Sequence, residues 1–226
     1  MTARGLFVTG TDTGVGKTRV AVALIHALRA AGLRVAAMKP VSAGNAPGGG
    51  NEGVAALLQA ANVPADVRDV NPYAFEPAIA PHLAAQQAGA RIELAVIAEA
   101  YARLAARADA VVVEGAGGWR VPLNEREDMA DLAQRLALPV VLVVGLRLGC
   151  LNHALLTAES IARRQVPWAG WVGNHIDPAM AQAAANLEAL RARLPGPCLG
   201  VQAFSADPAF SVDASPWLTL PQELIF

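Results

Sequence analysis

The sequence predicts an α/β fold in which a mainly parallel sheet carries helices on both faces. Short apolar runs alternate with segments of helical periodicity along the chain, the order that a parallel sheet with helical crossovers requires. Hydrophobic residues make up 54% and charged residues 16%, which excludes a disordered chain. No internal repeat or linker divides the 226 residues, so we expect a single domain over residues 1–226.

The N-terminal part of the chain is expected to alternate strands and helices around two loops. Leu6–Thr9 and Arg34–Met38 are short apolar runs of strand length, and Lys17–Ala31 between them has helical periodicity. Ser42–Gly53 contains three consecutive glycines and predicts a loop. A short helix is expected to follow over Val54–Ala61.

The middle of the chain is rich in proline and should be less regular. Residues 62–91 hold four prolines and predict irregular backbone, apart from a short helix near Leu83–Ala88. Ile92–Ala108 has the periodicity of a helix. Ala110–Val113 is wholly aliphatic, which is typical of a strand buried on both faces.

The C-terminal half continues the alternation, with apolar runs of strand length between longer helical segments. The tail from Phe204 onward is interrupted by prolines and predicts no regular element. In chain order, we expect a helix over Met129–Leu136, a strand over Val140–Val144, a helix over Asn152–Arg164, a strand over Trp168–Val172, a helix over Ala179–Leu194 and a strand over Cys198–Val201.

Composition excludes several classes of function. The net charge of −1 offers no basic stripe for nucleic acid. The longest apolar run, Leu136–Leu146, is too short to span a bilayer. The first ten residues already form a strand and a glycine loop, so no signal peptide is expected. Cys150 and Cys198 lack CxxC spacing, which favours a reducing compartment. We therefore expect a cytoplasmic protein that binds neither nucleic acid nor membranes.

The strongest functional pattern is the loop Gly10–Thr18, which reads Gly-Thr-Asp-Thr-Gly-Val-Gly-Lys-Thr. It follows an expected strand and opens an expected helix, as a phosphate-binding P-loop does. Backbone N–H groups of such a loop surround phosphate oxygens, while Lys17 can reach the β and γ phosphates and Thr18 can hold Mg²⁺. Five residues separate Gly10 from Gly16 where the usual pattern has four. An ordinary glycine-rich turn is the alternative.

A second lysine and an acid are expected at the same crevice. Lysine occurs only at Lys17 and Lys39, against sixteen arginines. Lys39 and Glu114 each end an expected strand, and the carboxyl ends of parallel strands converge on the ligand site. Glu114 could hold Mg²⁺ opposite Thr18, and Lys39 could hold a second anion. The alternatives are a solvated acid at a strand end and a surface lysine.

On these residues the chain resembles the dethiobiotin synthetases, a family with the P-loop NTPase fold. The shared segments occur in the same order over most of the length, and only the tail after Leu199 is loosely similar. They are Gly10–Thr18, Lys39–Val41, Asn71–Phe75, Ala80–His82, Val113–Trp119, Leu148–His153 and Ala169–Asn174.

The resemblance implies an ATP- and Mg²⁺-dependent ring closure in biotin biosynthesis. One amine of 7,8-diaminopelargonate captures CO2 as a carbamate, which attacks the γ-phosphate of ATP to form a carbamic–phosphoric anhydride. The second amine then closes the ureido ring of dethiobiotin and expels phosphate. Such chemistry depends on positioning and electrostatics, so no nucleophilic triad is needed.

The resemblance also implies roles for particular residues. Lys17 and Lys39 would act in catalysis by neutralising charge on the γ-phosphate and the carbamate, and Asn174 would read the adenine. The nucleotide would lie against Thr13, Gly14, Val15, Gly16, Lys17, Thr18, Glu114, Gly115, Ala116, Gly117 and Asn174. The metal would lie against Thr18, Glu114 and Glu52, and the substrate against Ser42, Pro81, Gly118, Cys150, Leu151 and Asn152.

The family further implies a homodimer with the diamine across its interface. The helix that starts near Asn152 would offer backbone N–H groups to the substrate carboxylate from the partner subunit. Without the family, Leu148–Cys150 before a helix is a plausible anion site or equally a simple helix cap.

The chain departs from the family pattern at four places. Gly53 stands where the family carries an aspartate for Mg²⁺, and the adjacent Glu52 could serve instead. Ala43 replaces a hydroxyl residue, with Ser42 one step earlier. His175 stands where an acid is often found, and Gln202–Phe204 replaces the proline segment that the family carries near its second nucleotide contact.

Two other functions fit the same fold. One is a switch ATPase that partitions cell components. Such proteins often carry a further lysine early in the P-loop, and some carry a basic C-terminal helix, neither of which occurs in this chain. The other is a non-catalytic nucleotide-binding homologue, which Gly53 and Ala43 would favour.

Overall fold

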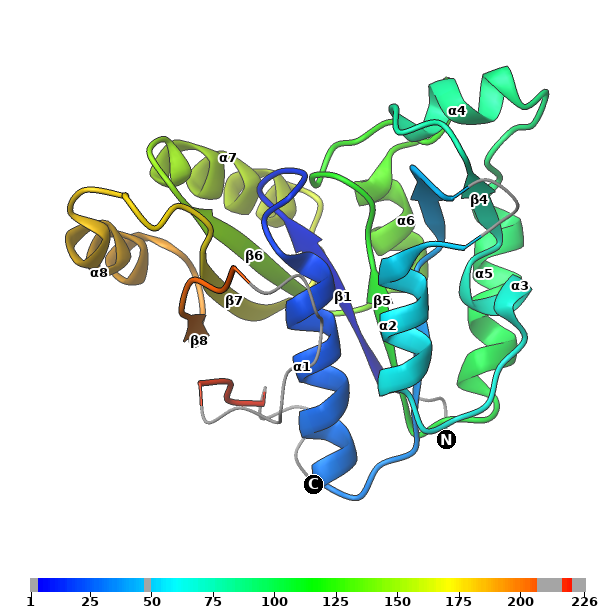
Figure 1. The fold of residues 1–226 in the computed structure, drawn as a ribbon, viewed down its shortest axis with the longest axis horizontal. Coiled ribbons are helices and arrows are strands. Elements are labelled where there is room, and N and C mark those ends of the chain that lie inside the picture. Colours follow the sequence, from blue (N-terminus) through cyan, green and yellow to red (C-terminus); the bar gives the residue numbers. More distant parts are fainter. Residues whose placement is uncertain (1–3, 47–49, 207–216, 221–226) are drawn as a thin grey trace.

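Six parallel strands form the central sheet of the molecule (Figure 1). The computed structural model describes residues 4–46, 50–206 and 217–220. Across the sheet the strand order is β2-β5-β1-β6-β7-β8. Their bounds are β1 (Arg4–Gly10), β2 (Val35–Met38), β5 (Ala110–Glu114), β6 (Val140–Leu146), β7 (Trp168–His175) and β8 (Cys198–Gln202).

Helices cover both faces of this sheet because its strands are apolar on both sides (Figure 1). In β1, Leu6 and Val8 pack in the core cluster of one face, whereas Phe7 between them packs in that of the other. The first face is covered by α1 (Lys17–Ala30) and α2 (Glu52–Ala60), and the second by α5 (Leu94–Ala105), α6 (Met129–Leu136) and α7 (Cys150–Arg163), with α8 (Ala183–Arg193) beside α7. The predicted α/β class is confirmed.

The prediction of irregular backbone between residues 62 and 91, apart from one short helix, is wrong in part, because the prolines there do not prevent regular structure. The chain forms α3 (Val67–Val70), β4 (Tyr73–Phe75) and α4 (Pro81–Gln87) there, and β4 pairs in parallel with β3 (Val41–Ala43). Three-residue strands are too short to show a period, and their pairing joins segments about thirty residues apart. The expected loop over Ser42–Gly53 is also wrong in part, since it contains most of β3 and the start of α2.

Other predicted elements exist, with shifted ends. The largest shifts are at α8, which begins at Ala183 instead of Ala179, at β7, which continues to His175, and at α5, which ends at Ala105 instead of Ala108. Helix α7 begins at Cys150, two residues earlier than expected, because Gly149 with φ 93° serves as its N-cap. No helix among the described residues is long and apolar enough to cross a membrane.

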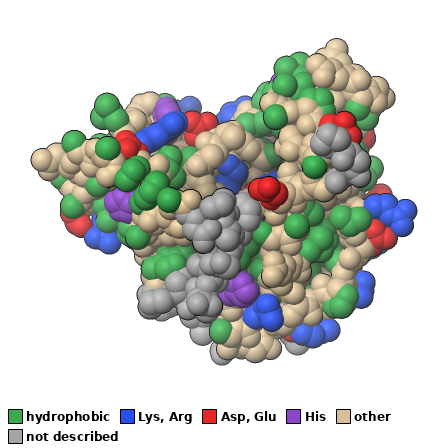
Figure 2. All heavy atoms as spheres, in the orientation of Figure 1, with side chains coloured by type: hydrophobic (Ala, Val, Ile, Leu, Met, Phe, Trp, Pro, Cys, Tyr) green, Lys and Arg blue, Asp and Glu red, His purple; other side chains and the backbone are tan. Residues whose placement is uncertain are grey.

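All six strands of the main sheet run in one direction, so their carboxyl ends lie at a single edge. The loops after β1, β2, β5 and β7 therefore meet there. The space-filling view shows the molecule hollowed along this upper edge, with a recessed basic side chain near the centre of the face (Figure 2).

Candidate nucleotide and substrate site

The loop between β1 and α1 has the backbone geometry of a phosphate-binding turn. Gly14 and Gly16 have φ of 74° and 90°, in the left-handed region that favours glycine. A Cβ at residue 16 would lie 2.1 Å from Nδ2 of Asn174, so a side chain there would displace Asn174. Gly16 is the N-cap of α1, which leaves the first N–H groups of this helix available for an anion.

Lys17 is buried at the start of α1 and has an unusual environment. Its Nζ donates a hydrogen bond to the carbonyl oxygen of Asp12 at 2.9 Å, and the residue is 7% exposed. Burial lowers the pKa of Lys17 to about 8, the carboxylate of Glu114 opposes that change, and the ammonium of Lys39 adds to it. The ammonium is therefore poorly solvated and close to a second cation, a setting in which a phosphate would be bound favourably.

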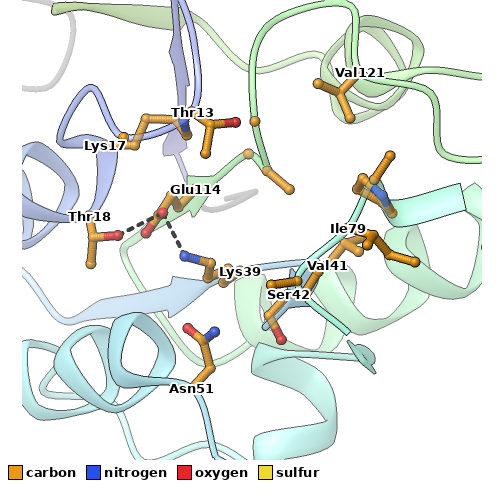
Figure 3. A pocket seen from close by; sticks show the side chains of 18 of the residues that line it. Thr13, Lys17, Thr18, Lys39, Val41, Ser42, Asn51, Ile79, Glu114 and Val121 are labelled. Atoms are coloured by element: carbon orange, nitrogen blue, oxygen red, sulfur yellow. Dashed lines mark hydrogen bonds and ion pairs between the residues drawn. The ribbon is translucent and has the colours of Figure 1, made fainter. Parts of the chain in front are cut away.

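Glu114 connects the other polar groups of the site (Figure 3). Its Oε1 accepts hydrogen bonds from Oγ1 of Thr18 and from Nζ of Lys39, both at 2.8 Å. The residue is 2% exposed, and its Oε2 has no partner among the described residues. A buried carboxylate oxygen without a partner is costly, so this atom is available for a ligand or a metal ion.

These groups line one cavity of about 750 Å³. The close-up shows their side chains turned toward a common space (Figure 3). The structure thus brings together most of the site residues predicted from the sequence. Those that line the cavity are Thr13, Gly14, Gly16, Lys17, Thr18, Lys39, Ser42, Pro81, Glu114, Gly115, Ala116 and Gly117.

The residues expected to hold a metal are only partly assembled. Thr18 and Glu114 supply oxygen donors, the ligand type that Mg²⁺ prefers. Glu52 is exposed and does not line the cavity, so the structure does not bring it to this site. Successive helical residues point in different directions, and here Gly53 faces the site: a Cβ on it would lie 2.9 Å from Nζ of Lys39 and 3.3 Å from Oγ1 of Thr18.

No group of three or more His, Cys, Asp or Glu side chains that could hold a metal occurs in the part of the chain described. Among the described residues that line the larger cavity, Glu114 is the one carboxylate. The donors present fit an ion that keeps several water ligands, as Mg²⁺ usually does.

Asn174 lies in a second, smaller cavity of about 230 Å³, which shares Gly14, Gly16 and Arg19 with the larger one. Its Nδ2 donates to the carbonyl oxygen of Val15 at 2.8 Å. This bond orients the carboxamide and leaves Oδ1 as its free acceptor. Val15 itself is buried beneath the loop and contributes this carbonyl.

The residues expected to contact substrate fall into two groups. Ser42 and Pro81 line the larger cavity, and Oγ of Ser42 donates to Oδ1 of Asn71 at 2.8 Å. Gly118 does not line either cavity, and a Cβ added to it would lie 3.6 Å from the carbonyl oxygen of Gly10. The segment 150–152 at the start of α7 lines neither cavity of this chain.

Sequence reasoning missed Asn51, which also lines the larger cavity. Its Oδ1 accepts from the backbone N–H of Val54 as the N-cap of α2, and its Nδ2 donates to Oδ1 of Asn45 at 3.1 Å. An asparagine shortly before a helical pattern is a capping signal that could have indicated it. Its place beside the cavity depends on tertiary packing.

Comparison with known proteins agrees with this geometry. A family described as an AAA domain matches residues 4–202. An ATP-dependent dethiobiotin synthetase from Nitrosospira multiformis is 54% identical over 198 residues, covering 88% of this chain and 87% of the relative. One from Aromatoleum aromaticum is 51% identical over 211 residues, covering 91% and 94%. Among solved structures, the MinC:MinD cell division complex of Aquifex aeolicus aligns with a TM-score of 0.58 at 17% identity, covering 91% of this chain and 83% of that one, and shares the fold.

Proposed function

Since the chain belongs to the family of ATP-dependent dethiobiotin synthetases, we propose that its two adjoining cavities bind ATP and that the larger one carries out ring closure. The enzyme converts 7,8-diaminopelargonate and CO2 to dethiobiotin in biotin biosynthesis. The observation that carries this assignment is the cluster of Lys17, Thr18, Lys39 and Glu114 at one sheet edge, in which Lys17 and Glu114 are buried.

The phosphates of ATP would lie along the Gly10–Thr18 loop. Lys17 and the N–H groups at the start of α1 would bind the phosphate oxygens, as in other P-loops. Because the site is recessed, an ion pair between Lys17 and phosphate is screened less than it would be on the surface. The loop residues Gly115, Ala116 and Gly117 would close the phosphate site from the opposite side.

Mg²⁺ would be held by the hydroxyl of Thr18 and by Glu114, whose Oε2 has no protein partner. The ion would supply positive charge that offsets the charge developing on the transferred phosphoryl group. Lys39 donates to the other oxygen of Glu114 and thereby fixes the orientation of the carboxylate.

The diamine and its carbamate would occupy the side of the larger cavity formed by Ser42, Pro81 and Lys39. Lys39 would neutralise the carbamate as it attacks the γ-phosphate, because its ammonium projects into the cavity from the end of β2. Ser42 would orient the substrate, since its own hydroxyl is held by Asn71. Positioning of this kind contributes much of the rate in reactions between two bound groups.

We also propose that two chains form the working unit, with Cys150, Leu151 and Asn152 of one subunit contacting the diamine of the other. Two features of α7 support this arrangement. Gly149 leaves the first N–H groups of the helix without a side-chain cap, and Leu148 just before it is 94% exposed. Leu156 on the same helix is 58% exposed, so the helix offers apolar surface to a second copy.

We place the enzyme in the cytoplasm, where its free thiols Cys150 and Cys198 would stay reduced. Nucleic acid and membranes are not expected partners. Basic and acidic side chains are interspersed over the face seen in Figure 2, without a continuous basic stripe there.

The proposed function predicts phosphate release that requires Mg²⁺-ATP, bicarbonate and 7,8-diaminopelargonate together, with dethiobiotin as the product. Omission of the diamine separates the alternatives. Hydrolysis at the same rate without the diamine would point to a switch ATPase. Nucleotide binding with no turnover under any condition would point to a non-catalytic homologue.

A further inference from the structure

Asn71 is a buried asparagine whose side chain joins two segments of the chain. It follows the last residue of α3, is 9% exposed and lines neither of the two cavities. Its Nδ2 donates hydrogen bonds to the carbonyl oxygens of Lys39 at 2.6 Å and of Tyr73 at 3.2 Å. Its Oδ1 accepts a hydrogen bond from Oγ of Ser42 at 2.8 Å. Both ends of the carboxamide are therefore used inside the protein.

The partners of Asn71 fix the orientation of its carboxamide. Carbonyl oxygens only accept hydrogen bonds, so the amide nitrogen must face Lys39 and Tyr73. The amide oxygen is then left for Ser42, whose hydroxyl must donate to it. The reversed carboxamide would place an oxygen against two carbonyl oxygens, so the three bonds hold the surrounding backbone in one arrangement.

The backbone of Lys39 lies where the chain passes from one sheet to the other. Strand β2 ends one residue before Lys39, β3 begins two residues after it, and Pro40 between them has no backbone N–H. The N–H of Lys39 donates to the carbonyl oxygen of Val70 at 2.8 Å, and its own carbonyl oxygen accepts from Asn71. Lys39 is thus held on both sides of its Cα by two consecutive residues, while its Nζ reaches Glu114.

We propose that Asn71 is a positioning residue for ring closure, which fixes the backbone of Lys39 so that the ammonium is directed at the carbamate and the γ-phosphate. This inference rests on the proposed function, in which Lys39 neutralises the attacking carbamate. Misplacing a catalytic group by about 1 Å can cost roughly 100-fold in rate. None of the three bonds of the Asn71 side chain reaches the Gly10–Thr18 loop, so ATP binding should not depend on it.

The test separates turnover from nucleotide affinity, with all assays run well below the unfolding temperature of each variant. Asn71→Ala removes all three hydrogen bonds, whereas Asn71→Asp keeps the acceptor for Ser42 and loses both donors. Both substitutions should lower the kcat of diamine-dependent phosphate release roughly 10- to 100-fold, since both release the carbonyl of Lys39. The dissociation constant for Mg²⁺-ATP, measured by calorimetry, should stay within about twofold of the wild type.

Asn124→Ala is the matched control for the loss of a buried asparagine. Asn124 is 7% exposed, and its Nδ2 donates to the carbonyl oxygen of Ile92 at 2.9 Å, outside both cavities. Its substitution should lower the unfolding temperature as Asn71→Ala does, because each leaves a buried carbonyl without its donor. It should leave kcat unchanged, which a merely structural role of Asn71 would not distinguish from Asn71→Ala.

A double substitution tests whether Asn71 acts through Lys39. Lys39→Arg already displaces the charge, so adding Asn71→Ala to it should lower kcat by less than about threefold further. Losses that multiply in the double variant would overturn the proposal, as would an ATP affinity that falls as much as kcat. Near-normal kcat in Asn71→Asp would also overturn it, because the bond to Ser42 would then be sufficient. A wild type without diamine-dependent phosphate release would instead refute the proposed function.

Discussion

The ammonium of Lys17 makes nucleotide binding and stability depend on pH. Its pKa of about 8 means that the folded, ligand-free protein begins to lose this charge just above neutrality. The pKa lies below the ordinary value of 10.5, so the charged form costs stability below pH 8, and that cost is relieved as the pH rises from 8 to 10.5. Phosphate restores the charge by pairing with it.

Affinity for Mg²⁺-ATP should therefore fall as the pH rises from 7 to 9. Binding at pH 8.5 should take up protons, because the phosphates raise the pKa of Lys17. Calorimetry in buffers of different ionisation enthalpy measures this uptake. Lys17→Met serves as the reference, since its residual binding should lack the proton uptake. An affinity that stays constant across this range would contradict the role given to Lys17.

A positive charge alone, without the shape of a lysine side chain, should not sustain turnover at position 17 or at position 39. Lys17→Arg and Lys39→Arg should each lower turnover by about 100-fold or more, since displaced electrostatic groups forfeit several kcal/mol of transition-state stabilisation. Lys17 is 7% exposed, and Lys39 donates to one oxygen of Glu114, so neither position suits the planar guanidinium group of an arginine. Steady-state phosphate release measures the effect. Near-normal rates in both variants would remove the catalytic role.

The Mg²⁺ requirement for nucleotide binding should depend on the residue at position 53 and should not depend on Glu52. Gly53→Asp should lower the Mg²⁺ concentration needed for nucleotide binding, because its Cβ would face Thr18 and the flexible end of Lys39 can move aside. Glu52→Ala should leave that concentration unchanged, since Glu52 is exposed. Mg²⁺ titrations of nucleotide affinity decide between the two residues, and a raised Mg²⁺ requirement in Glu52→Ala would restore Glu52 as a ligand.

At the scale of elements, the turn from β1 into α1 determines whether nucleotide binds. Gly16→Ala would place a side chain at φ 90° and push it against Asn174. We expect the substitution to lower the free energy of unfolding by about 1–3 kcal/mol and to abolish ATP binding. Denaturant unfolding and calorimetry measure the two effects. Gly32→Ala, which also has a positive φ but has open space around its Cβ position, is the control: it should lose stability and keep nucleotide affinity.

Elements with a strong internal period could be predicted from the sequence, and elements defined by their partners could not. Helix α6 was predicted with its observed bounds because its capping aspartate and amphipathic pattern are local signals. Strands β3 and β4 were missed because each is three residues long and exists through its pairing with the other.

The same distinction holds for the site. Lys17 and Thr18 belong to a local motif, and Glu114 ends an obvious strand, so these three could be placed in advance. Position 52 was preferred to 53 because of its charge, whereas the direction of each side chain follows from where α2 begins. Gln202 stands opposite Asn174 because of the register between β7 and β8, and that neighbour relation could not be predicted from the sequence.

At the scale of the whole molecule, we propose that residues 1–226 form one domain and that two such chains make the active unit. Leu148→Glu should produce a monomer, because a charge at that exposed apolar position would be buried on association. The monomer should still bind ATP and should lose diamine-dependent phosphate release. Sedimentation measures its size. Val67→Glu, at another exposed apolar residue on α3, is the control and should remain dimeric and active.

The place of β1 in the sheet has a consequence for how the protein is made. The strand that leads into the phosphate loop is synthesised before both of its neighbours in the sheet, β5 and β6, whose residues follow more than about a hundred positions later. On the ribosome, its apolar residues must wait for both neighbours to emerge. Strand β1 thus emerges before either of its neighbours, and its apolar residues stay exposed to aggregation until β6 has also left the ribosome.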